Sequence, residues 1–509
     1  MSKAQTAQDF KTQSPIGPIV PGSNGATPEQ KLAEVDALLA MAMLPDKPQQ
    51  DPAAQELDRF LLSAPVDDDG NSQCLVRMFP DRFLCCDAFG WLVYLDGYWH
   101  MANAEAALDA AVVETLRRRV NAAMGSFGNG GQADAILKFC KPNRNRIEGT
   151  KALLRHKVAA EASDFDTHRD LLNCANGVVD LRTGELLPHS PAYKFMHRTA
   201  ASYNPAANSG QWVAWLRESI EHPADVDWLQ EFFGYSITGH TREDCLLHIW
   251  GPPRSGKGTL AGAISAALGG RLAMGLSFST LTAPHDRDSQ GFAFAPLQPA
   301  RVVVASEMEE GQRLNGARVK MLTGGDKVHC SYKGKDHFDY TPQWKIVLLT
   351  NPELDADPAD NALWARVHSV QFPHSHEGDE DRLLRDSWQT PESQEAILAW
   401  MVAGSIIWYA RGGRGLPRLA SSIEHKQERR KELDSVAKWL DESTTADPAA
   451  KVQRTVLYKN YVQWCEDNGH MPLGSTRFGQ SMRSRGYETK VLREGATTFK
   501  GYEGLSLVG

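Results

Sequence analysis

A glycine-rich segment between a short apolar run and a helical pattern constrains the fold of this chain more than any other feature. Residues 251–259 read Gly-Pro-Pro-Arg-Ser-Gly-Lys-Gly-Thr, after the apolar run 246–250 and before the helical pattern 260–268. This is the G-x-x-x-x-G-K spacing between a strand and a helix. Glycines let backbone N–H groups turn toward phosphate oxygens, and the helix N-terminus adds its dipole. The segment predicts a phosphate-binding loop in an α/β fold.

The loop predicts a site for ATP and Mg²⁺. Lys257 is expected to reach the β- and γ-phosphates. The Ser or Thr that usually follows this lysine and ligates Mg²⁺ is replaced by Gly258, so Thr259 is the candidate metal ligand. The alternative interpretation is an ordinary glycine-rich turn. The predicted nucleotide-binding residues are Gly251, Ser255, Gly256, Lys257, Gly258 and Thr259.

Two further apolar runs end in polar residues. Residues 301–306 read Arg-Val-Val-Val-Ala-Ser and are followed by Glu307, whereas residues 345–350 are followed by Asn351. Runs of this kind are typical of buried parallel strands, whose carboxyl ends meet at one edge of a sheet. Glu307 is expected to act in catalysis and in Mg²⁺ binding, and Asn351 to contact the γ-phosphate or a water. Taken alone, Asn351 is better interpreted as a turn residue before a proline.

Arg366 follows in the segment 361–367. An arginine that reaches a neighbouring subunit's γ-phosphate stabilises the charge of the transition state. On its local sequence alone, Arg366 is more simply interpreted as a surface arginine.

The order of these segments resembles the superfamily 3 helicases, specifically their poxvirus-type and phage primase-helicase branch. The most specific piece is residues 319–328, Val-Lys-Met-Leu-Thr-Gly-Gly-Asp-Lys-Val, which resemble an additional motif between the carboxylate strand and the third strand. Residues 173–185 and 234–239 resemble the region upstream of the ATPase. The resemblance runs from about residue 77 to the C-terminus.

The resemblance implies a role for each candidate residue. Lys257 corresponds to the Walker A lysine and Glu307 to the Walker B glutamate. Asn351 corresponds to sensor 1, and Arg366 to an arginine finger that acts across a subunit boundary. The family often carries two arginines there, but Ala365 occupies the first position in this chain. A site completed by a neighbour requires a head-to-tail ring, and the family implies a hexamer.

The resemblance also implies that Lys333 and Lys335 lie near a hairpin facing a central channel. Lysines that flank a glycine in a turn offer mobile positive charge to DNA phosphates. The alternative is a solvated loop.

Composition excludes little. The net charge of −8 is not that of a globally basic nucleic-acid binder, although local basic patches suffice for a channel. The eight cysteines show no metal-binding spacing and are interpreted as reduced and structural. No signal peptide and no long apolar run is present, so we expect a cytoplasmic protein of a bacterial host cell without a membrane partner.

The expected fold class is α/β, with an AAA+-like P-loop ATPase core, an α+β N-terminal region and a C-terminal winged-helix domain. Helices followed by two strands near the C-terminus suggest the winged helix, and a structural lid or subunit contact is the alternative. Its candidate DNA-binding residues are Arg477, Arg483 and Arg485. The expected domains are a mobile tail with one helix at 28–43 (1–70), the α+β region (71–235), the ATPase core (236–375), a helical connector (376–434) and the winged-helix domain (435–509). In the α+β region we expect short strands around Phe83, Trp91 and Trp99, a helix at 104–124 and a hairpin at 171–188. In the last domain we expect helices at 456–468 and 475–485, followed by strands at 487–491 and 497–502.

These expectations favour a ring-shaped replicative helicase of a phage, plasmid or integrated element, which moves on single-stranded DNA and opens forks. A primase or polymerase is an expected partner. One alternative is a replication initiator that binds an origin and uses ATP for assembly or melting. Another is a P-loop ATPase that acts on protein partners. No paired-aspartate strand of the kind that primer synthesis needs is found, so we expect no primase activity from this chain.

Overall fold

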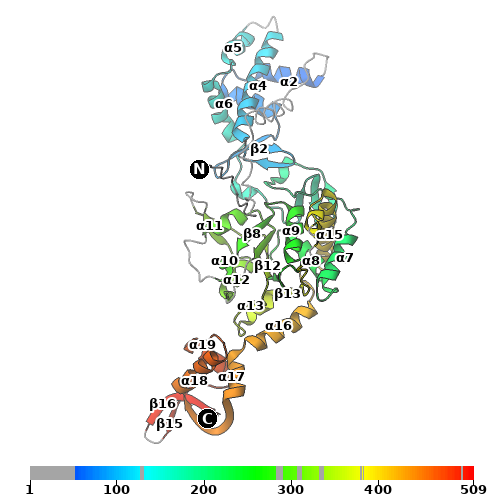
Figure 1. Cartoon of the computed structure of the whole chain (residues 1–509). Helices are drawn as coiled ribbons and strands as arrows, with labels where there is room; N and C mark the ends of the chain where they lie inside the picture. The colour runs from blue at the N-terminus through cyan, green and yellow to red at the C-terminus, as the bar shows by residue number, and fades with distance from the viewer. Residues whose placement is uncertain are drawn as a thin grey trace, which may run out of the picture. The chain divides into compact units, whose positions relative to one another are not determined.

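The computed structural model of the chain describes residues 52–125, 131–282, 291–306, 312–331, 337–378, 381, 383–494 and 497–508 (Figure 1). The described part divides into two compact units. The first consists of the chain up to Tyr94 together with His100–Ala162, and the second of Leu95–Trp99 together with Ser163–Gly509. No described helix combines the length and the apolar character that a membrane crossing requires.

The first unit is mostly helical. Its helices are α2 (Pro52–Ser63), α3 (Asp68–Met78), α4 (Ala104–Gly125), α5 (Gln132–Phe139) and α6 (Arg144–Lys157). The strands predicted around Phe83, Trp91 and Trp99 are confirmed as β1 (Phe83–Cys86), β2 (Gly90–Leu95) and β3 (Tyr98–His100), which form one sheet. Within this sheet, Leu95 and the first two residues of β3 are assigned to the second unit. The helix predicted at 104–124 is confirmed as α4.

Residues 52–70 fall within the predicted N-terminal tail, yet they form α2 and the start of α3. The buried guanidinium of Arg119 on α4 connects these two helices, because it donates to the carbonyl oxygens of Leu61, Ala64 and Pro65 and to Asn71 Oδ1. A charged side chain is stable in such surroundings only when its hydrogen bonds are satisfied, as they are here. The helix predicted at 28–43 lies outside the described residues.

The second unit contains a five-stranded parallel sheet. The predicted strands are confirmed as β7 (Leu246–Trp250), β9 (Val302–Ser306) and β12 (Lys345–Thr350). Two strands that were not predicted, β8 (Ala273–Ser277) and β13 (Val367–Gln371), complete the order β13-β7-β12-β9-β8. Every residue of β12 is buried, which explains why this strand reads as a continuous apolar run.

Helices cover both faces of this sheet (Figure 1). Alternate strand residues contribute to two separate cores, since successive side chains point to opposite faces. Val347 and Leu349 pack on the side of α7 (Gly210–Ser219), α8 (Asp225–Ile237), α9 (Lys257–Leu268) and α15 (Pro391–Ala410). Ile346 and Leu348 pack on the side of α10 (Ser279–Thr282), α11 (Gly291–Phe294), α12 (Gly316–Thr323) and α13 (Asn361–Arg366). The α/β class is therefore confirmed for the core.

One smaller sheet precedes the core along the chain, and another lies within it. The hairpin predicted at 171–188 is confirmed as β4 (Leu171–Cys174), β5 (Gly177–Asp180) and β6 (Glu185–Leu187). Within the core, β10 (Val328–Ser331) pairs with β11 (His337–Tyr340). After β13 the chain forms α14 (Leu384–Ser387), α15 and α16 (Ala420–Leu433).

The C-terminal segment packs three helices against a three-stranded sheet. The helices are α17 (Ser435–Ser443), α18 (Arg454–Asp467) and α19 (Ser475–Ser484), and the sheet has the order β14-β16-β15. Its strands are β14 (Thr444–Gln453), β15 (Lys490–Glu494) and β16 (Thr497–Leu507). Trp439, Tyr461 and Phe478 form its own core. The sequence predicted α18, α19 and a strand pair, but missed α17 and β14.

Candidate functional site

The strand order locates the candidate site. The chain leaves β7 toward β8 at one edge of the sheet, whereas it leaves β12 toward β13 at the other edge. Strands β7 and β12 are neighbours, so the direction of the connections reverses between them. In open parallel sheets, ligands bind at the carboxyl ends of strands at such a point. The glycine-rich loop follows β7 and Asn351 follows β12, so both lie at this point.

The shape of the loop requires glycine at two positions. Gly251 has a φ of 147°, and a Cβ atom there would lie 2.0 Å from the carbonyl oxygen of Phe372. Gly256 has a φ of 97°, and a Cβ atom there would lie 3.3 Å from the ring of Trp215 and 3.6 Å from that of Phe372. Both φ values lie in the region that residues other than glycine rarely adopt.

Lys257 is the first residue of α9 and is buried, with 7% of its surface exposed. Its Nζ donates to the carbonyl oxygens of Gly251 and Pro252, both at 2.7 Å, and to Ser255 Oγ at 3.2 Å. Burial lowers the pKa of this ammonium group. The cation therefore lies within the loop, against its oxygen atoms.

The start of α9 suits an anion. Gly256 is the cap residue and provides no side-chain hydrogen bond to the first turn. The N–H groups of a first helical turn have no partner within the helix, and they attract negative charge. With the buried Lys257 beside them, the described residues fit a phosphate group. Gly258 is exposed and Thr259 is half-buried in the same turn.

The structure describes the residue that follows β12 but not the one that follows β9. Ser306 closes β9 and is exposed, whereas Glu307 lies outside the described residues. Asn351 directly follows β12 and is exposed. Among the described residues, no group of three or more His, Cys, Asp or Glu side chains could hold a metal ion. Of the two predicted Mg²⁺ ligands, Thr259 and Glu307, only Thr259 belongs to the described residues.

A buried histidine, which the sequence did not predict as functional, supports the end of β12. His248 on β7 lies between Ser369 Oγ, at 3.2 Å from its Nδ1, and Thr350 Oγ1, at 2.8 Å from its Nε2. Thr350 Oγ1 donates to the carbonyl oxygen of Pro352, so it accepts from His248 Nε2–H. Burial lowers the pKa of His248 to about 3, which keeps the ring neutral. This chain of bonds fixes the turn that carries Asn351.

Arg366 ends α13 and forms bonds within its own chain. Its Nη2 contacts Asp244 Oδ2 at 3.0 Å, its Nε contacts Thr323 Oγ1 at 3.2 Å, and its Nη1 contacts the carbonyl oxygen of Ala362 at 3.0 Å. The side chain is 19% exposed. The structure therefore places Arg366 next to Asp244 rather than next to Lys257 of the same chain.

The candidate DNA-binding residues differ in their surroundings. Lys333 and Lys335 lie outside the described residues, between the two strands of the β10–β11 hairpin. Arg477 and Arg483 on α19 are exposed, and Arg477 Nη1 lies 3.8 Å from Asp357 Oδ2. Arg485 instead bonds to Asp434 and to the carbonyl oxygen of Ser481. Its guanidinium ties the end of α19 to the start of α17.

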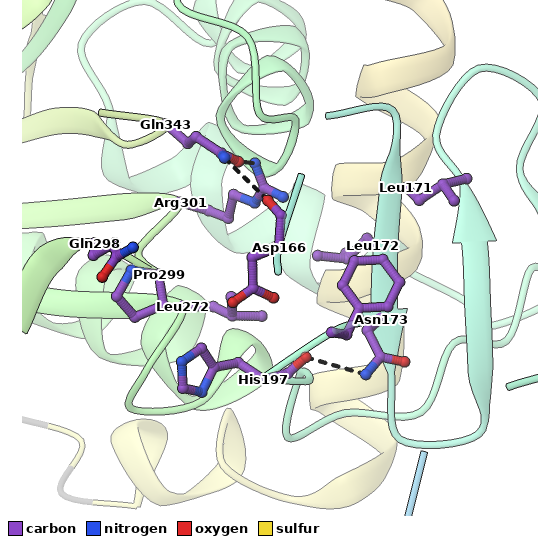
Figure 2. A pocket seen from close by; sticks show the side chains of 11 residues that line it. Asp166, Leu171, Leu172, Asn173, His197, Leu272, Gln298, Pro299, Arg301 and Gln343 are labelled. Carbon is purple, nitrogen blue, oxygen red and sulfur yellow. Dashed lines mark hydrogen bonds between the residues drawn. The ribbon is translucent and has the colours of Figure 1, made fainter. Parts of the chain in front are cut away.

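A second polar cluster, which the sequence did not predict, lies at the amino ends of the strands. Arg301 precedes β9 and bonds to Gln343, and burial lowers its pKa to about 10 (Figure 2). Asp166 lines the same hollow, and burial raises its pKa to about 6. Lys345 donates to the carbonyl oxygens of Ser236, Thr238 and Gln343. Buried charges outside any motif carry no sequence signal, because arginine and lysine are usually exposed.

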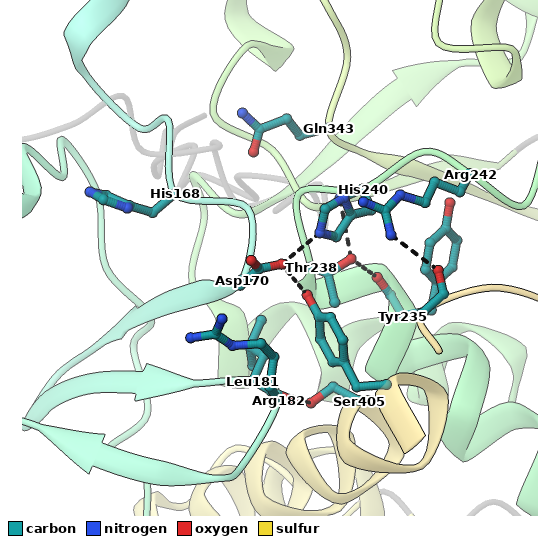
Figure 3. Close-up of polar contacts among 12 residues, drawn as sticks. His168, Asp170, Leu181, Arg182, Tyr235, Thr238, His240, Arg242, Gln343 and Ser405 are labelled. Atoms are coloured by element: carbon teal, nitrogen blue, oxygen red, sulfur yellow. Dashed lines mark hydrogen bonds and ion pairs between the residues drawn. The ribbon is translucent and has the colours of Figure 1, made fainter. Parts of the chain in front are cut away.

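Beside this cluster, Asp170 accepts two hydrogen bonds. His240 Nε2 lies 2.6 Å from Asp170 Oδ1, and the hydroxyl of Tyr409 donates to the same oxygen at 2.5 Å (Figure 3). These bonds join the entry to β4, the segment before β7 and the end of α15. They have a structural role on the edge opposite the glycine-rich loop. The eight cysteines are all buried and free, in agreement with a structural role.

Three family models match the chain. They are described as "D5 N terminal like" over residues 72–221, a family of unknown function over residues 249–366, and "RFX DNA-binding domain" over residues 434–498. Among solved structures, the apo structure of the NrS-1 C terminal region matches with 10% identity and a TM-score of 0.39, covering 59% of this chain and 77% of that one.

Two curated viral proteins are similar in sequence. "Putative helicase 121R" of Invertebrate iridescent virus 3 is 26% identical over 151 residues, which are 29% of this chain and 16% of that protein. "Putative helicase 184R" of Invertebrate iridescent virus 6 is 23% identical over 232 residues, which are 41% of this chain and 22% of that protein. The match thus spans about a fifth of these relatives. The D5-like segment and the similarity to two helicase-named viral proteins agree with the resemblance to the poxvirus-type and phage primase-helicase family.

Proposed function

We propose that the chain is an ATP-dependent DNA helicase of replication, which assembles into a hexameric ring and moves along single-stranded DNA. The observation that carries this proposal is the glycine-rich loop with buried Lys257 at the point where the strand connections reverse. The site is that of a P-loop ATPase of the AAA+ type. Phages, plasmids and integrated elements of a bacterial host are the setting that we propose, with the protein in the cytoplasm and a primase or polymerase as partner.

Each residue has a distinct task in this proposal. The backbone of residues 251–258 and Lys257 bind the phosphates of ATP, and Ser255 supports the lysine from within the loop. Thr259 and Glu307 hold Mg²⁺, which supplies charge neutralisation at the phosphates when it is bound. Glu307 and Asn351 orient the attacking water, and Arg366 of a neighbouring chain stabilises the developing charge.

DNA contacts complete the proposal. Lys333 and Lys335 grip the strand backbone in the central channel of the ring. The C-terminal segment is a winged helix that presents Arg477 and Arg483 to DNA. Its match to a family model described as an RFX DNA-binding domain supports this assignment.

The test is ATP hydrolysis by the wild type and by Lys257→Ala, with and without single-stranded DNA, followed by unwinding of a forked substrate. We expect DNA to stimulate hydrolysis in the wild type, and Lys257→Ala to abolish it. Lys431→Ala, on the exposed side of α16, is the matched control and should behave as the wild type. Equal hydrolysis by wild type and Lys257→Ala would contradict the assignment of the site.

A second function is favoured only by the match of the C-terminal segment to the family model described as an RFX DNA-binding domain. A replication initiator would bind a specific duplex through residues 434–498 and use ATP only for assembly or melting. Sequence-specific duplex binding that survives Lys257→Ala, in a protein that unwinds no fork, would support the initiator. Hydrolysis that ignores DNA altogether would instead support an ATPase acting on protein partners.

A further inference from the structure

The segment that follows β13 folds back over the glycine-rich loop. The N–H group of Phe372 donates to the carbonyl oxygen of Trp250 at 2.8 Å. Ser375 Oγ donates to the carbonyl oxygen of Pro253 at 2.8 Å, and the N–H group of His376 donates to that of Arg254 at 3.2 Å. Residues 372–376 are therefore hydrogen-bonded to the backbone of the loop and of the end of β7.

Helix α14 is fixed by its neighbours. Trp388, which directly follows the helix, is 8% exposed, and its ring lies 5.2 Å from that of Trp212 and 5.8 Å from that of Trp215. Leu384 packs against the same core, and α14 contacts α9. Trp215 in turn lies beside Gly256. The position of α14 relative to the loop is thus set by packing of large apolar side chains.

This packing brings Arg385 to the first turn of α9. A Cβ atom built on Gly258 would lie 3.5 Å from Arg385 Nη2. Arg385 is exposed, and within the described ranges it has neither a hydrogen bond nor an ion pair. An arginine that is positioned by packing but has no anionic partner is suited to bind an external anion, since its planar fork matches phosphate oxygens.

The residue at position 258 faces the guanidinium. A serine or threonine there, as the motif usually has, would place its Cβ at ordinary van der Waals distance from Arg385 Nη2. Glycine leaves this space open. A polyphosphate at the N-terminus of α9 would then lie between two cations, Lys257 within the loop and Arg385 outside it.

We propose that Arg385 is a phosphate-binding residue of the nucleotide site in the same chain, and that it occupies the side of the site that Gly258 leaves open. This inference rests on the proposed function. The ligand is a nucleoside triphosphate, because the terminal phosphates carry the charge that a second cation would bind. Arg385 would thus compensate in part for the missing hydroxyl at position 258.

Equilibrium titration of the full chain with mant-ATP and mant-ADP, with Mg²⁺ and with EDTA, tests this inference. We expect Arg385→Ala to weaken mant-ATP binding at least tenfold and mant-ADP binding less. Arg385→Lys should recover part of the loss, because it keeps the positive charge. Arg414→Ala, an exposed arginine after α15, is the matched control. Circular dichroism checks that each variant is folded.

The outcomes separate the inference from the proposed function. Wild-type protein that binds mant-ATP, together with Arg385→Ala that binds it as tightly as Arg414→Ala does, would overturn the role of Arg385 and leave the proposed function standing. Wild-type protein that binds neither nucleotide would overturn both. Equal weakening of mant-ATP and mant-ADP would also count against the inference, because it would show no preference for the terminal phosphate.

Discussion

Gly251 and Gly262 lie in the same loop–helix segment, but their surroundings differ. A Cβ atom on Gly251 would collide with the carbonyl oxygen of Phe372, whereas one on Gly262 in α9 would meet nothing within 4 Å. Gly251→Ala must therefore displace the loop. We expect it to weaken nucleotide binding at least tenfold and to lower stability by several kcal/mol, roughly as other strained backbone positions do.

Gly262→Ala is the matched control for this prediction. Alanine stabilises a helix interior relative to glycine by up to about 1 kcal/mol, so Tm should stay the same or rise. Thermal unfolding and mant-ATP titration measure the two effects. Normal nucleotide binding by Gly251→Ala would mean that the loop does not need its observed shape.

Two histidines, the buried His248 and the partly buried His368, predict acid lability. His368 stacks on Trp228 with ring centroids 4.9 Å apart, and burial lowers its pKa to about 4. Its unfolded value is near 6.5, so the unfolded state takes up the proton first. The contribution of the neutral ring to stability is complete above about pH 6.5 and is lost as pH falls toward 4.

His368→Phe keeps the aromatic contact with Trp228 and removes this titration. We expect the free energy of unfolding of this variant to fall less steeply than that of the wild type between pH 6.5 and 4. The two falls should differ by up to about 3 kcal/mol over that range. Urea unfolding at a series of pH values measures the slope. His374→Gln, at an exposed position, should leave it unchanged. Part of the pH dependence of the unfolding free energy should remain in every variant, because burial also lowers the pKa of His248.

At the residue scale, the sequence could predict the loop but not its surroundings. Gly251, Gly256 and Lys257 stand in a contiguous motif, so spacing alone revealed them. His248 and Arg385 carry no local signal, since each acquires its neighbours from segments far away in the chain. Arg366 was assigned by resemblance, and only the structure shows its pair with Asp244.

At the scale of elements, buried strands were easier to predict than half-buried ones. Strands β7, β9 and β12 lie inside the sheet and read as apolar runs. Strands β8 and β13 form its two edges, and each mixes buried with partly or fully exposed residues without regular alternation. Such a pattern resembles a loop or a short helix in sequence. Strand β14 is largely exposed and contains a proline, which weakens its signal further.

Helix α19 allows a prediction on DNA binding. Arg477 and Arg483 are exposed on this helix, whereas Arg485 is bound to Asp434. If α19 contacts DNA phosphates, Arg477→Ala with Arg483→Ala should weaken duplex binding uniformly across sequences and reduce the salt slope by about 2. Fluorescence anisotropy at several salt concentrations measures this.

Arg485→Ala should act differently, because it removes the ion pair that Arg485 forms with Asp434. We expect lower thermal stability with an unchanged salt slope. If the double variant keeps the salt slope of the wild type, α19 is not the phosphate-binding surface, and a structural or subunit-contact role of this segment is favoured.

At the scale of the whole molecule, the ion pair between Arg366 and Asp244 bears on how several chains would assemble. Within one chain, Arg366 bonds to Asp244 and Thr323 rather than to the glycine-rich loop. A role in ATP hydrolysis therefore requires that it reach a neighbour's site, which implies a head-to-tail ring. Lys257→Ala and Arg366→Ala would each be inactive alone. Their defects would lie on opposite sides of the subunit interface.

Mixing these two inactive variants tests the ring directly. In a randomly mixed ring, about a quarter of the interfaces join an intact Lys257 to an intact Arg366, because each is present in half of the chains. We expect about that fraction of wild-type ATPase activity to return. A mixture of Lys257→Ala with the double variant contains no intact interface and should stay inactive. Native mass spectrometry shows whether the chains have mixed; mixed rings without recovered activity would mean that Arg366 does not complete a neighbour's site.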